Sequence, residues 1–314
     1  MIEHYLIDNS KIVSTKWAEP GGWINIYPPF SREEIEGMSK RLNIPFDYFI
    51  DSLDVDERSR FESDEGLQFI VLNTPVKDQS SEMEADFITI PLGIIERDDY
   101  LITISSKKNP VIEYFEKNGF KNLDAGNHSN FVLKLFDQNN RLYLQYLKQL
   151  NRQRNLYEEE LYNSSRNKEL AKLLNIQKSL VYFVTSLRAN ELMMMKIKRT
   201  DFLKIKENEA EFDFLEDIIV DCSQALEMSD VYSNILNGTM DAFASIISNN
   251  LNNIMKRLTA ITIVLMVPTL VASFYGMNVN LPFEKNPYAF ALILIISLIL
   301  SFLIIFIFNK RKWF

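Results

Sequence analysis

Residues and motifs that carry enzyme chemistry are scarce in this sequence of 314 residues. It has one cysteine and two histidines, and it contains no glycine-rich phosphate loop, no HExxH motif and no serine–histidine or cysteine–histidine set. The single cysteine, Cys222, excludes an intrachain disulfide and fits a cytoplasmic body. The N-terminus lacks the basic and apolar regions of a signal peptide, so none is expected. An enzyme is therefore the function class that the sequence favours least.

One acidic stretch of the chain also contains no lysine or arginine. The net charge of −8 at pH 7 excludes a general nucleic-acid-binding protein, because polyphosphates require a basic surface. Lysine and arginine are absent from residues 207–255, whereas residues 188–206 are basic. Two interpretations remain open: a solvated helix face beside a basic one, or an acidic sleeve leading into a cation path. The acids of the stretch are Glu207, Glu209, Glu211, Asp213, Glu216, Asp217, Asp221, Glu227, Asp230 and Asp241.

Two apolar segments without a charged residue stand near the C-terminus, at residues 258–274 and 289–308. Since a hydrocarbon core about 30 Å thick needs roughly 20 helical residues, both are predicted to cross a membrane. The second segment is interpreted as apolar all round, whereas the first has a stripe of polar and sulfur-containing residues on one face. Such a stripe suits a helix that lines a wet path better than one that faces lipid. The stripe consists of Thr259, Thr262, Met266, Thr269 and Ser273.

Basic residues flank the two segments at their outer ends. Lys256 and Arg257 precede the first segment, residues 310–312 follow the second, and the link between them has one lysine, Lys285. The positive-inside rule then places both termini in the cytoplasm and predicts a multi-pass protein of the cell membrane. Two helices per chain cannot enclose a channel, so several copies must surround an axis if the stripe lines one. The geometry therefore predicts a cyclic homo-oligomer.

The first 125 or so residues have the pattern of a mixed α/β domain. Ser31, with Glu34 three residues on, forms a capping box that predicts a helix over residues 31–42. Asn109 and the following proline are expected to open another helix, which Gly119 ends. The acidic residues 51–66 are predicted to form a surface loop or a short helix. Strands are predicted at residues 22–28, 67–75, 85–95 and 99–106.

A helical pattern begins at about Asn130, because proline is absent from residues 130–267 and only Gly238 interrupts the run. The last helix starts near Glu207 and has no stop signal before the first apolar segment. If it continues to Tyr275, it is roughly 100 Å long at 1.5 Å per residue. A helix of that length needs neighbours in water. The apolar residues at heptad-like spacing on its first part are most simply interpreted as packing against other helices.

The sequence 275-YGMN-278 closes the first apolar segment. Placed at the outer end of the penultimate span, with a second span and a basic tail after it, this motif resembles the Gly-Met-Asn signature of the CorA family of magnesium and cobalt channels. The resemblance covers the whole chain. It implies an α+β membrane protein and a homopentameric funnel that takes up hydrated Mg²⁺, and also Co²⁺ and Ni²⁺, as its cargo.

The parts expected from the sequence and the resemblance follow one another along the chain. They are a cytoplasmic α/β domain (1–128), antiparallel cytoplasmic helices (129–206), a stalk helix (207–257), a transmembrane pore helix (258–275), an extracytoplasmic loop (276–288), a second transmembrane helix (289–308) and a basic cytoplasmic tail (309–314).

The resemblance assigns the selectivity filter to Gly276, Met277 and Asn278. Mg²⁺ gives up its waters reluctantly, and a ring of Asn278 amide oxygens can accept hydrogen bonds from those waters. Gly276 is expected to let the backbone turn sharply. The alternative is that Gly276 and Asn278 only end the helix, which is a common role for both residue types.

Further along the pore helix, the family pattern assigns pore-lining positions and a gate. Met255 and Leu258 are assigned to a hydrophobic gate that closes by excluding water, and ordinary helix packing is the alternative. The residues assigned to the pore lining are Asn252, Thr262, Met266 and Thr269.

The family also senses cytoplasmic Mg²⁺ through acidic sites between subunits, and the bound ions hold the closed state. The pattern of an apolar strand followed by an aspartate matches 69-FIVLNTPVKD-78 and indicates Asp78. The stalk acid at the family's distance before the Gly-Met-Asn motif is Asp217. Mg²⁺ is then both cargo and regulator. The alternative for each aspartate is a plain surface carboxylate.

Two other functions compete with a magnesium channel. A zinc transporter of the same superfamily is the nearest, but zinc prefers nitrogen and sulfur ligands, and His4, His128 and Cys222 lie away from the expected path. A membrane-anchored cation sensor that does not conduct is the other, and the polar stripe argues against it.

Overall fold

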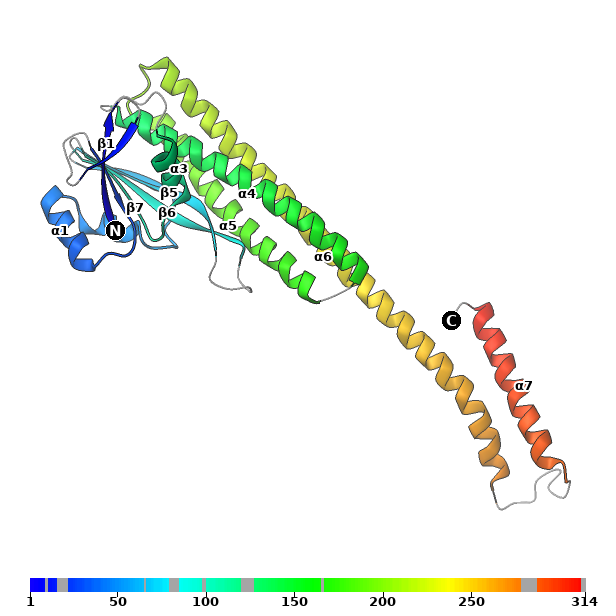
Figure 1. Ribbon diagram of the computed structural model, residues 1–314. Helices are drawn as coiled ribbons and strands as arrows, with labels where there is room; N and C mark the ends of the chain where they lie inside the picture. Colours follow the sequence, from blue (N-terminus) through cyan, green and yellow to red (C-terminus); the bar gives the residue numbers. More distant parts are fainter. Residues whose placement is uncertain are drawn as a thin grey trace. The chain divides into compact units, whose positions relative to one another are not determined.

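The computed structural model describes most of the chain. The described residues are 1–8, 11–15, 22–64, 66–78, 85–97, 100–119, 127–164, 167–277 and 287–311. They divide into two compact units, Met1–Gly238 and Thr239–Phe314. Each unit is described by itself (Figure 1).

A seven-stranded sheet forms the centre of the first unit, in the order β2-β1-β3-β7-β6-β5-β4. Only the β3–β7 pair is parallel among these neighbours, so the sheet belongs to a mixed α/β domain, as expected. The strands are β1 (Ile2–Asp8), β2 (Lys11–Thr15), β3 (Gly22–Ile26), β4 (Arg60–Asp64), β5 (Leu67–Lys77), β6 (Phe87–Arg97) and β7 (Tyr100–Ser105).

Three of these strands did not follow from the sequence. β1 and β2 were not predicted, and β4 lies in a segment predicted to be a loop or a short helix. β4 is an edge strand of mostly acidic and polar residues that pairs only with β5. Its residues therefore do not alternate between buried and exposed, which is the pattern that predicts a strand. The pairing partner, rather than the strand's own pattern, fixes its conformation.

Helices cover both faces of the sheet (Figure 1). On one face, Ile35 and Met38 of α1 (Arg32–Leu42) and Phe49 of α2 (Phe46–Asp51) join a core with Ile24 and Phe69 of the sheet. On the other face lie α3 (Pro110–Asn118), α4 (His128–Ser164) and α5 (Asn167–Thr200).

The helix signals found in the sequence are confirmed. Ser31 and Glu34 form the predicted capping box of α1. The Asn109 side chain caps α3, and Gly119 ends it with a positive φ of 68°.

The backbone of Asn73, a buried residue of β5, accepts and donates hydrogen bonds that connect helices α4 and α5 to the sheet. The side-chain amide of Asn190 on α5 donates to the Asn73 carbonyl (2.8 Å) and accepts from the Asn73 backbone N–H (3.1 Å). Asn139 and Tyr143 of α4 donate to the same carbonyl, at 3.2 and 3.1 Å. Asn73 lies beyond the end of β4, where the backbone of β5 has lost its neighbouring strand. Side chains of the two helices therefore replace that strand's hydrogen bonds.

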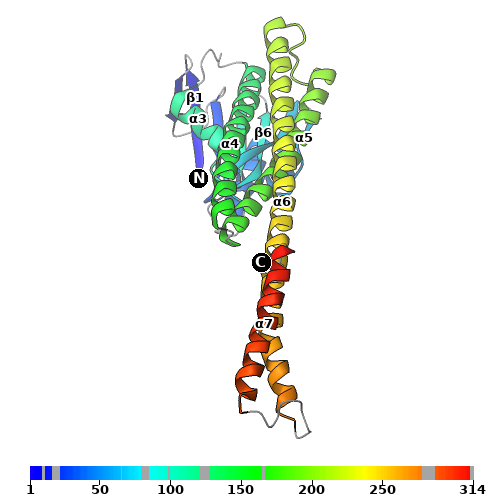
Figure 2. The ribbon, with the colours of Figure 1, turned by 90° about the vertical axis from the view of Figure 1, so that its right-hand side faces the viewer.

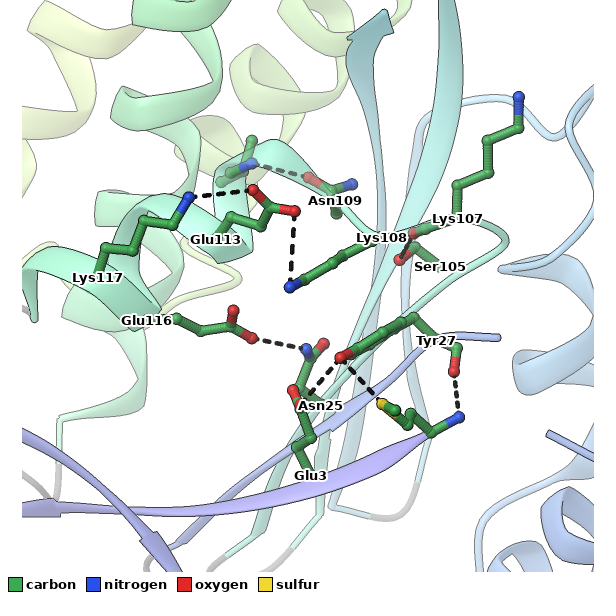
Figure 3. A network of polar contacts seen from close by, with 12 residues as sticks. Glu3, Asn25, Tyr27, Ser105, Lys107, Lys108, Asn109, Glu113, Glu116 and Lys117 are labelled. Atoms are coloured by element: carbon green, nitrogen blue, oxygen red, sulfur yellow. Dashed lines mark hydrogen bonds and ion pairs between the residues drawn. The ribbon is translucent and has the colours of Figure 1, made fainter. Parts of the chain in front are cut away.

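A polar network attaches α3 to the first strands (Figure 3). Glu116 of α3 accepts hydrogen bonds from the Tyr5 hydroxyl (3.1 Å) and from the Asn25 amide (3.3 Å). Glu3 accepts from Tyr5 (2.8 Å) and from Tyr27 (2.9 Å). Two carboxyl groups of different elements therefore share the Tyr5 hydroxyl.

The longest helix, α6 (Glu209–Tyr275), has 67 residues, and α7 (Ala289–Lys310) has 22. Both are long and apolar enough to cross a membrane. The first part of α6 packs on α4 and α5, since the Asn140 amide donates to the Ile218 carbonyl (2.8 Å) and the Cys222 thiol lies 3.7 Å from the Leu187 carbonyl. Leu215, Cys222 and Ser229 are fully buried, which confirms that the heptad-like stripe is a packing face.

Candidate ion pathway

The residues predicted to line a pore share one exposed face of α6 in the second unit. Successive members are three or four residues apart, so they form one stripe along a helix with 3.6 residues per turn. The large apolar side chains of the stripe are exposed: Met255 by 52 %, Leu258 by 57 % and Met266 by 65 %. With the gate positions and Asn252 included, the stripe consists of Asn252, Met255, Leu258, Thr262, Met266 and Thr269, all of which are exposed, as are Thr259 and Ser273 of the polar stripe seen in the sequence.

Helix α7 covers the opposite face of α6, and Figures 1 and 2 show it returning beside the apolar part of that helix. Ala260 is fully buried and Val264 is half-buried. At 100° per residue, these two positions lie on the side of the helix away from the stripe. The contact with α7 therefore leaves the stripe free.

The threonine hydroxyls of the stripe donate their protons to backbone carbonyls of their own helix. Thr262 donates to the Leu258 carbonyl (2.9 Å), and Thr269 donates to the Leu265 carbonyl (3.1 Å). A hydroxyl has one proton, so each oxygen offers only lone pairs to the outside. The waters around a cation present their hydrogens outward. The stripe therefore offers hydrogen-bond acceptors that suit a hydrated cation.

The end of α6 is described up to Met277. The Gly276 N–H donates to the Ala272 carbonyl (3.0 Å), and the Met277 N–H to the Phe274 carbonyl (3.3 Å). Gly276 does not take a positive φ, and a Cβ placed on it would make only ordinary contact, 3.4 Å from the Ala272 oxygen. Neither a left-handed helix cap nor crowding by the described residues therefore explains this glycine. Asn278 lies outside the described residues, so its assignment to the filter stays a prediction.

Two serines of α7 correct the interpretation of that segment as apolar all round. Ser297 and Ser301 are 7 % and 8 % exposed, and the Ser301 hydroxyl lies within hydrogen-bonding distance of the Val264 carbonyl of α6 (3.5 Å). Their spacing of four residues in an aliphatic run is the small-residue pattern of packed membrane helices. That spacing was the sequence signal for the face of α7 that contacts α6.

The two predicted regulatory aspartates have different surroundings in the first unit. The Asp78 side chain is 7 % exposed and ion-paired with Lys107, and its backbone N–H donates to the Asp86 carbonyl (3.1 Å). Asp217 is exposed on α6. Among the described residues, no group of three or more histidine, cysteine, aspartate or glutamate side chains could hold a metal ion within one chain. The role of both aspartates stays a prediction.

Part of the acidic stretch of α6 is neutralised by α5. Glu216 pairs with Lys198, and Asp230 lies 3.4 Å from Arg188. These pairs support the interpretation of one acidic helix face beside a basic one for this part of α6. They do not involve Asp241, which is exposed and closer to the stripe.

Comparisons with known proteins agree on one family. The profile of the CorA-like Mg²⁺ transporter proteins matches residues 22–311. The cobalt/magnesium transport protein CorA of Methanocaldococcus jannaschii is 30 % identical over 301 residues, which are 93 % of this chain and 90 % of that protein. The corresponding protein of Thermotoga maritima is 22 % identical and covers 93 % and 83 %.

Solved structures extend this similarity to the whole fold. The complete structure of the CorA magnesium transporter from Methanocaldococcus jannaschii superposes with a TM-score of 0.83 at 26 % identity, covering 100 % of this chain and 99 % of the other. The cytoplasmic domain of ZntB from Vibrio parahaemolyticus superposes with a TM-score of 0.59 at 12 % identity, covering 79 % and 98 %. The second likeness concerns the fold alone.

Proposed function

Because the chain belongs to the CorA-like Mg²⁺ transporter family, we propose that it is a channel for the uptake of hydrated divalent cations across the cytoplasmic membrane. Mg²⁺ is the main cargo, Co²⁺ and Ni²⁺ take the same path, and the inward membrane potential drives the flux. The observation that carries the proposal is the exposed stripe on α6, on the side that α7 does not cover. Lipid would be a poor neighbour for its amide and hydroxyl oxygens.

The proposed assembly is a homopentamer with α6 of each protomer around the axis and α7 outside. The exposed side chains of Met255 and Leu258 then face their counterparts in other copies. A narrow ring of such side chains excludes water and forms the hydrophobic gate. Both termini lie in the cytoplasm, with basic residues at the inner ends of the two spans.

The proposed path begins at the filter of Gly276, Met277 and Asn278. A ring of Asn278 amides binds the hydrated ion through its waters, which spares the cost of dehydrating Mg²⁺. A Cβ at position 276 has room among the described residues of one chain, so we attribute the glycine there to neighbouring copies that approach one another at the mouth. Thr269, Thr262 and Asn252 then supply further oxygens toward the cytoplasm.

Regulation by cytoplasmic Mg²⁺ is proposed to act through Asp78 and Asp217 of adjacent subunits. An ion held between two carboxylates stabilises the arrangement in which they are close, so it favours one state of the gate by its differential affinity. Within one chain the Asp78 carboxylate is already paired with the Lys107 ammonium. An incoming ion must therefore compete with that lysine.

Purified protein in liposomes tests the proposal and its rivals. Uptake of Mg²⁺, Co²⁺, Ni²⁺ and Zn²⁺ is compared with and without a proton gradient. A channel for hydrated cations passes Mg²⁺ without needing the gradient. A zinc transporter passes Zn²⁺ in preference, and a sensor binds Mg²⁺ without passing any ion. Either of the last two results rejects the magnesium channel.

A further inference from the structure

A proline interrupts the hydrogen bonding of α6 in the middle of the stripe. Pro268 lies inside the helix, between Met266 and Thr269. Proline has no N–H, so the carbonyl four residues earlier, that of Val264, is deprived of its helical donor. In a membrane no water replaces the missing donor, and a helix tends to bend at such a point. Another side chain that donates to this carbonyl therefore stabilises the helix at this point.

Helix α7 brings a donor to this carbonyl. The Ser301 hydroxyl lies 3.5 Å from the Val264 oxygen and 3.0 Å from the Ser297 oxygen of its own helix. The hydroxyl has one proton, so the two carbonyls share it. The bond to Ser297 is the usual one for a serine in a helix. The contact with Val264 is not usual, because it crosses to the one carbonyl that Pro268 leaves without its donor.

Ser297 shows what an ordinary serine does in the same setting. It is as buried as Ser301, at 7 % against 8 % exposed, and it stands one turn earlier on the same face of α7. Its hydroxyl donates to the Leu294 carbonyl of its own helix (2.8 Å). The two serines therefore match in size, burial and helix, and they differ in the contact with α6.

We propose that Ser301 is a positioning residue for the ion path: its hydroxyl serves the Val264 carbonyl and so fixes the course of α6 at Pro268. Val264 lies on the face away from the stripe, so a change in this contact tilts the stripe on either side of the proline. The gate side, with Leu258 and Thr262, then moves relative to Thr269 and the mouth. The consequence for flux rests on the proposed channel function, whereas the contact itself does not.

A double-mutant cycle on the full-length protein tests the inference. In Pro268→Ala, residue 268 regains an N–H and can serve Val264 itself. Ser301→Ala is therefore expected to change the unfolding midpoint and the Mg²⁺ flux in the native background. In the Pro268→Ala background it should change neither. In the native background we expect the thermal unfolding midpoint in detergent to fall by about 2 °C, the order expected for one interhelical hydrogen bond. The Mg²⁺ flux in liposomes should change by about threefold.

Two further variants keep the result decisive. Ser297→Ala removes a matched serine and should leave both the midpoint and the flux close to native values. Ser301→Cys keeps the size and a weak donor, and it should fall between native and Ser301→Ala. The inference is overturned if Ser301→Ala has the same effect in both backgrounds, or if Ser297→Ala has an equal effect.

The two readouts separate this inference from the channel proposal. If the native protein passes no Mg²⁺, the channel proposal fails, and the unfolding midpoints still test the contact. If the native protein conducts but the cycle shows no coupling between positions 268 and 301, the inference fails and the channel proposal stands.

Discussion

The Nζ atom of Lys107 lies 3.6 Å from Oδ1 of Asp78, whose side chain is 7 % exposed while that of the lysine is 49 % exposed. The aspartate therefore has a cationic partner supplied by its own chain. Figure 3 shows that the next residue, Lys108, points to the other side of the same loop, toward Glu113 of α3 (3.7 Å). Two adjacent lysines thus make separate ion pairs, and only one of them is a competitor for a cation at Asp78.

Replacing Lys107 should make the protein more sensitive to Mg²⁺. In Lys107→Gln the ammonium no longer competes for Asp78, so the Mg²⁺ concentration that gives half-maximal protection against proteolysis should fall. We expect a fall of about 1.4- to fivefold, since a partly exposed ion pair contributes about 0.2–1 kcal/mol. Lys108→Gln is the matched control and should not change the midpoint. An unchanged midpoint in Lys107→Gln would count against Asp78 as a cation ligand.

Removing both proposed regulatory carboxylates should weaken closure by Mg²⁺. In the double variant Asp78→Ala, Asp217→Ala, the ion loses the groups that give it a higher affinity for one state than for the other. Protection against proteolysis by millimolar Mg²⁺ should then be lost, and flux should persist at internal Mg²⁺ concentrations that close the native channel. Undiminished protection would place the regulatory sites elsewhere.

Asn278→Ala should abolish Mg²⁺ uptake and leave assembly intact. The substitution removes the amide oxygens that are proposed to hold the waters of the entering ion, and it lies in the link between α6 and α7. Flux into liposomes measures the first effect, and the elution volume in detergent measures the second. Native flux from the variant would reject the filter assignment.

Two consecutive asparagines offer a direct test of the stripe. Asn252 lies on it, whereas Asn253 is turned by about 100° around the helix axis, and both are exposed. Asn252→Ala should lower the Mg²⁺ flux by about two- to tenfold, the range for a lost hydrogen bond of about 0.5–1.5 kcal/mol. Asn253→Ala should leave it near the native value. Equal effects of the two substitutions would contradict a path along this face.

The carboxyl pair on α3 and β1 should make the stability of the first unit, Met1–Gly238, depend on pH. Burial raises the pKa of Glu116 above its ordinary value of 4.5, and the charge of Glu3 adds to that effect. Burial acts on Glu3 in the same direction, but hydrogen bonds from Tyr5 and Tyr27 bring its pKa below the ordinary value. A proton shared by the pair therefore resides mainly on Glu116.

The sign of the expected effect follows from the raised pKa. Above pH 4.5 and up to the raised pKa, the folded state binds more protons at Glu116 than the unfolded state does. The free energy of unfolding therefore falls as the pH rises through that window. Glu116→Gln keeps an acceptor oxygen and removes the titration, so its unfolding midpoint should lose this pH dependence. Glu113→Gln, on the same helix, should retain it.

The stripe on α6 was predictable from the sequence because a helix repeats its faces every three or four residues. Residues such as Thr262 and Thr269 share a side whatever surrounds the helix. The capping residues Ser31 and Asn109 were equally predictable, since they act within one turn of chain. Strand β4 was not, because its conformation depends on pairing with β5.

The Asp78–Lys107 pair and the contact between Ser301 and Val264 could not be predicted for a related reason. In both cases the partners are far apart in sequence, and only the fold brings them together. Pro268 alone indicates that a carbonyl loses its donor, but it does not indicate which side chain of α7 lies opposite. Asn278 lies outside the described residues, so its assignment to the filter still rests on the family's motif.

The burial of Cys222 has a practical consequence for anyone who labels this protein. It is the only cysteine in the chain, it is fully buried, and burial raises the pKa of its thiol well above the ordinary value. Thiol reagents attack the thiolate, so this native residue should react slowly while the protein is folded. A cysteine introduced at an exposed position of the first unit, such as Lys117, whose side chain is 74 % exposed, can therefore be alkylated or spin-labelled selectively, with no need to mutate the native one first.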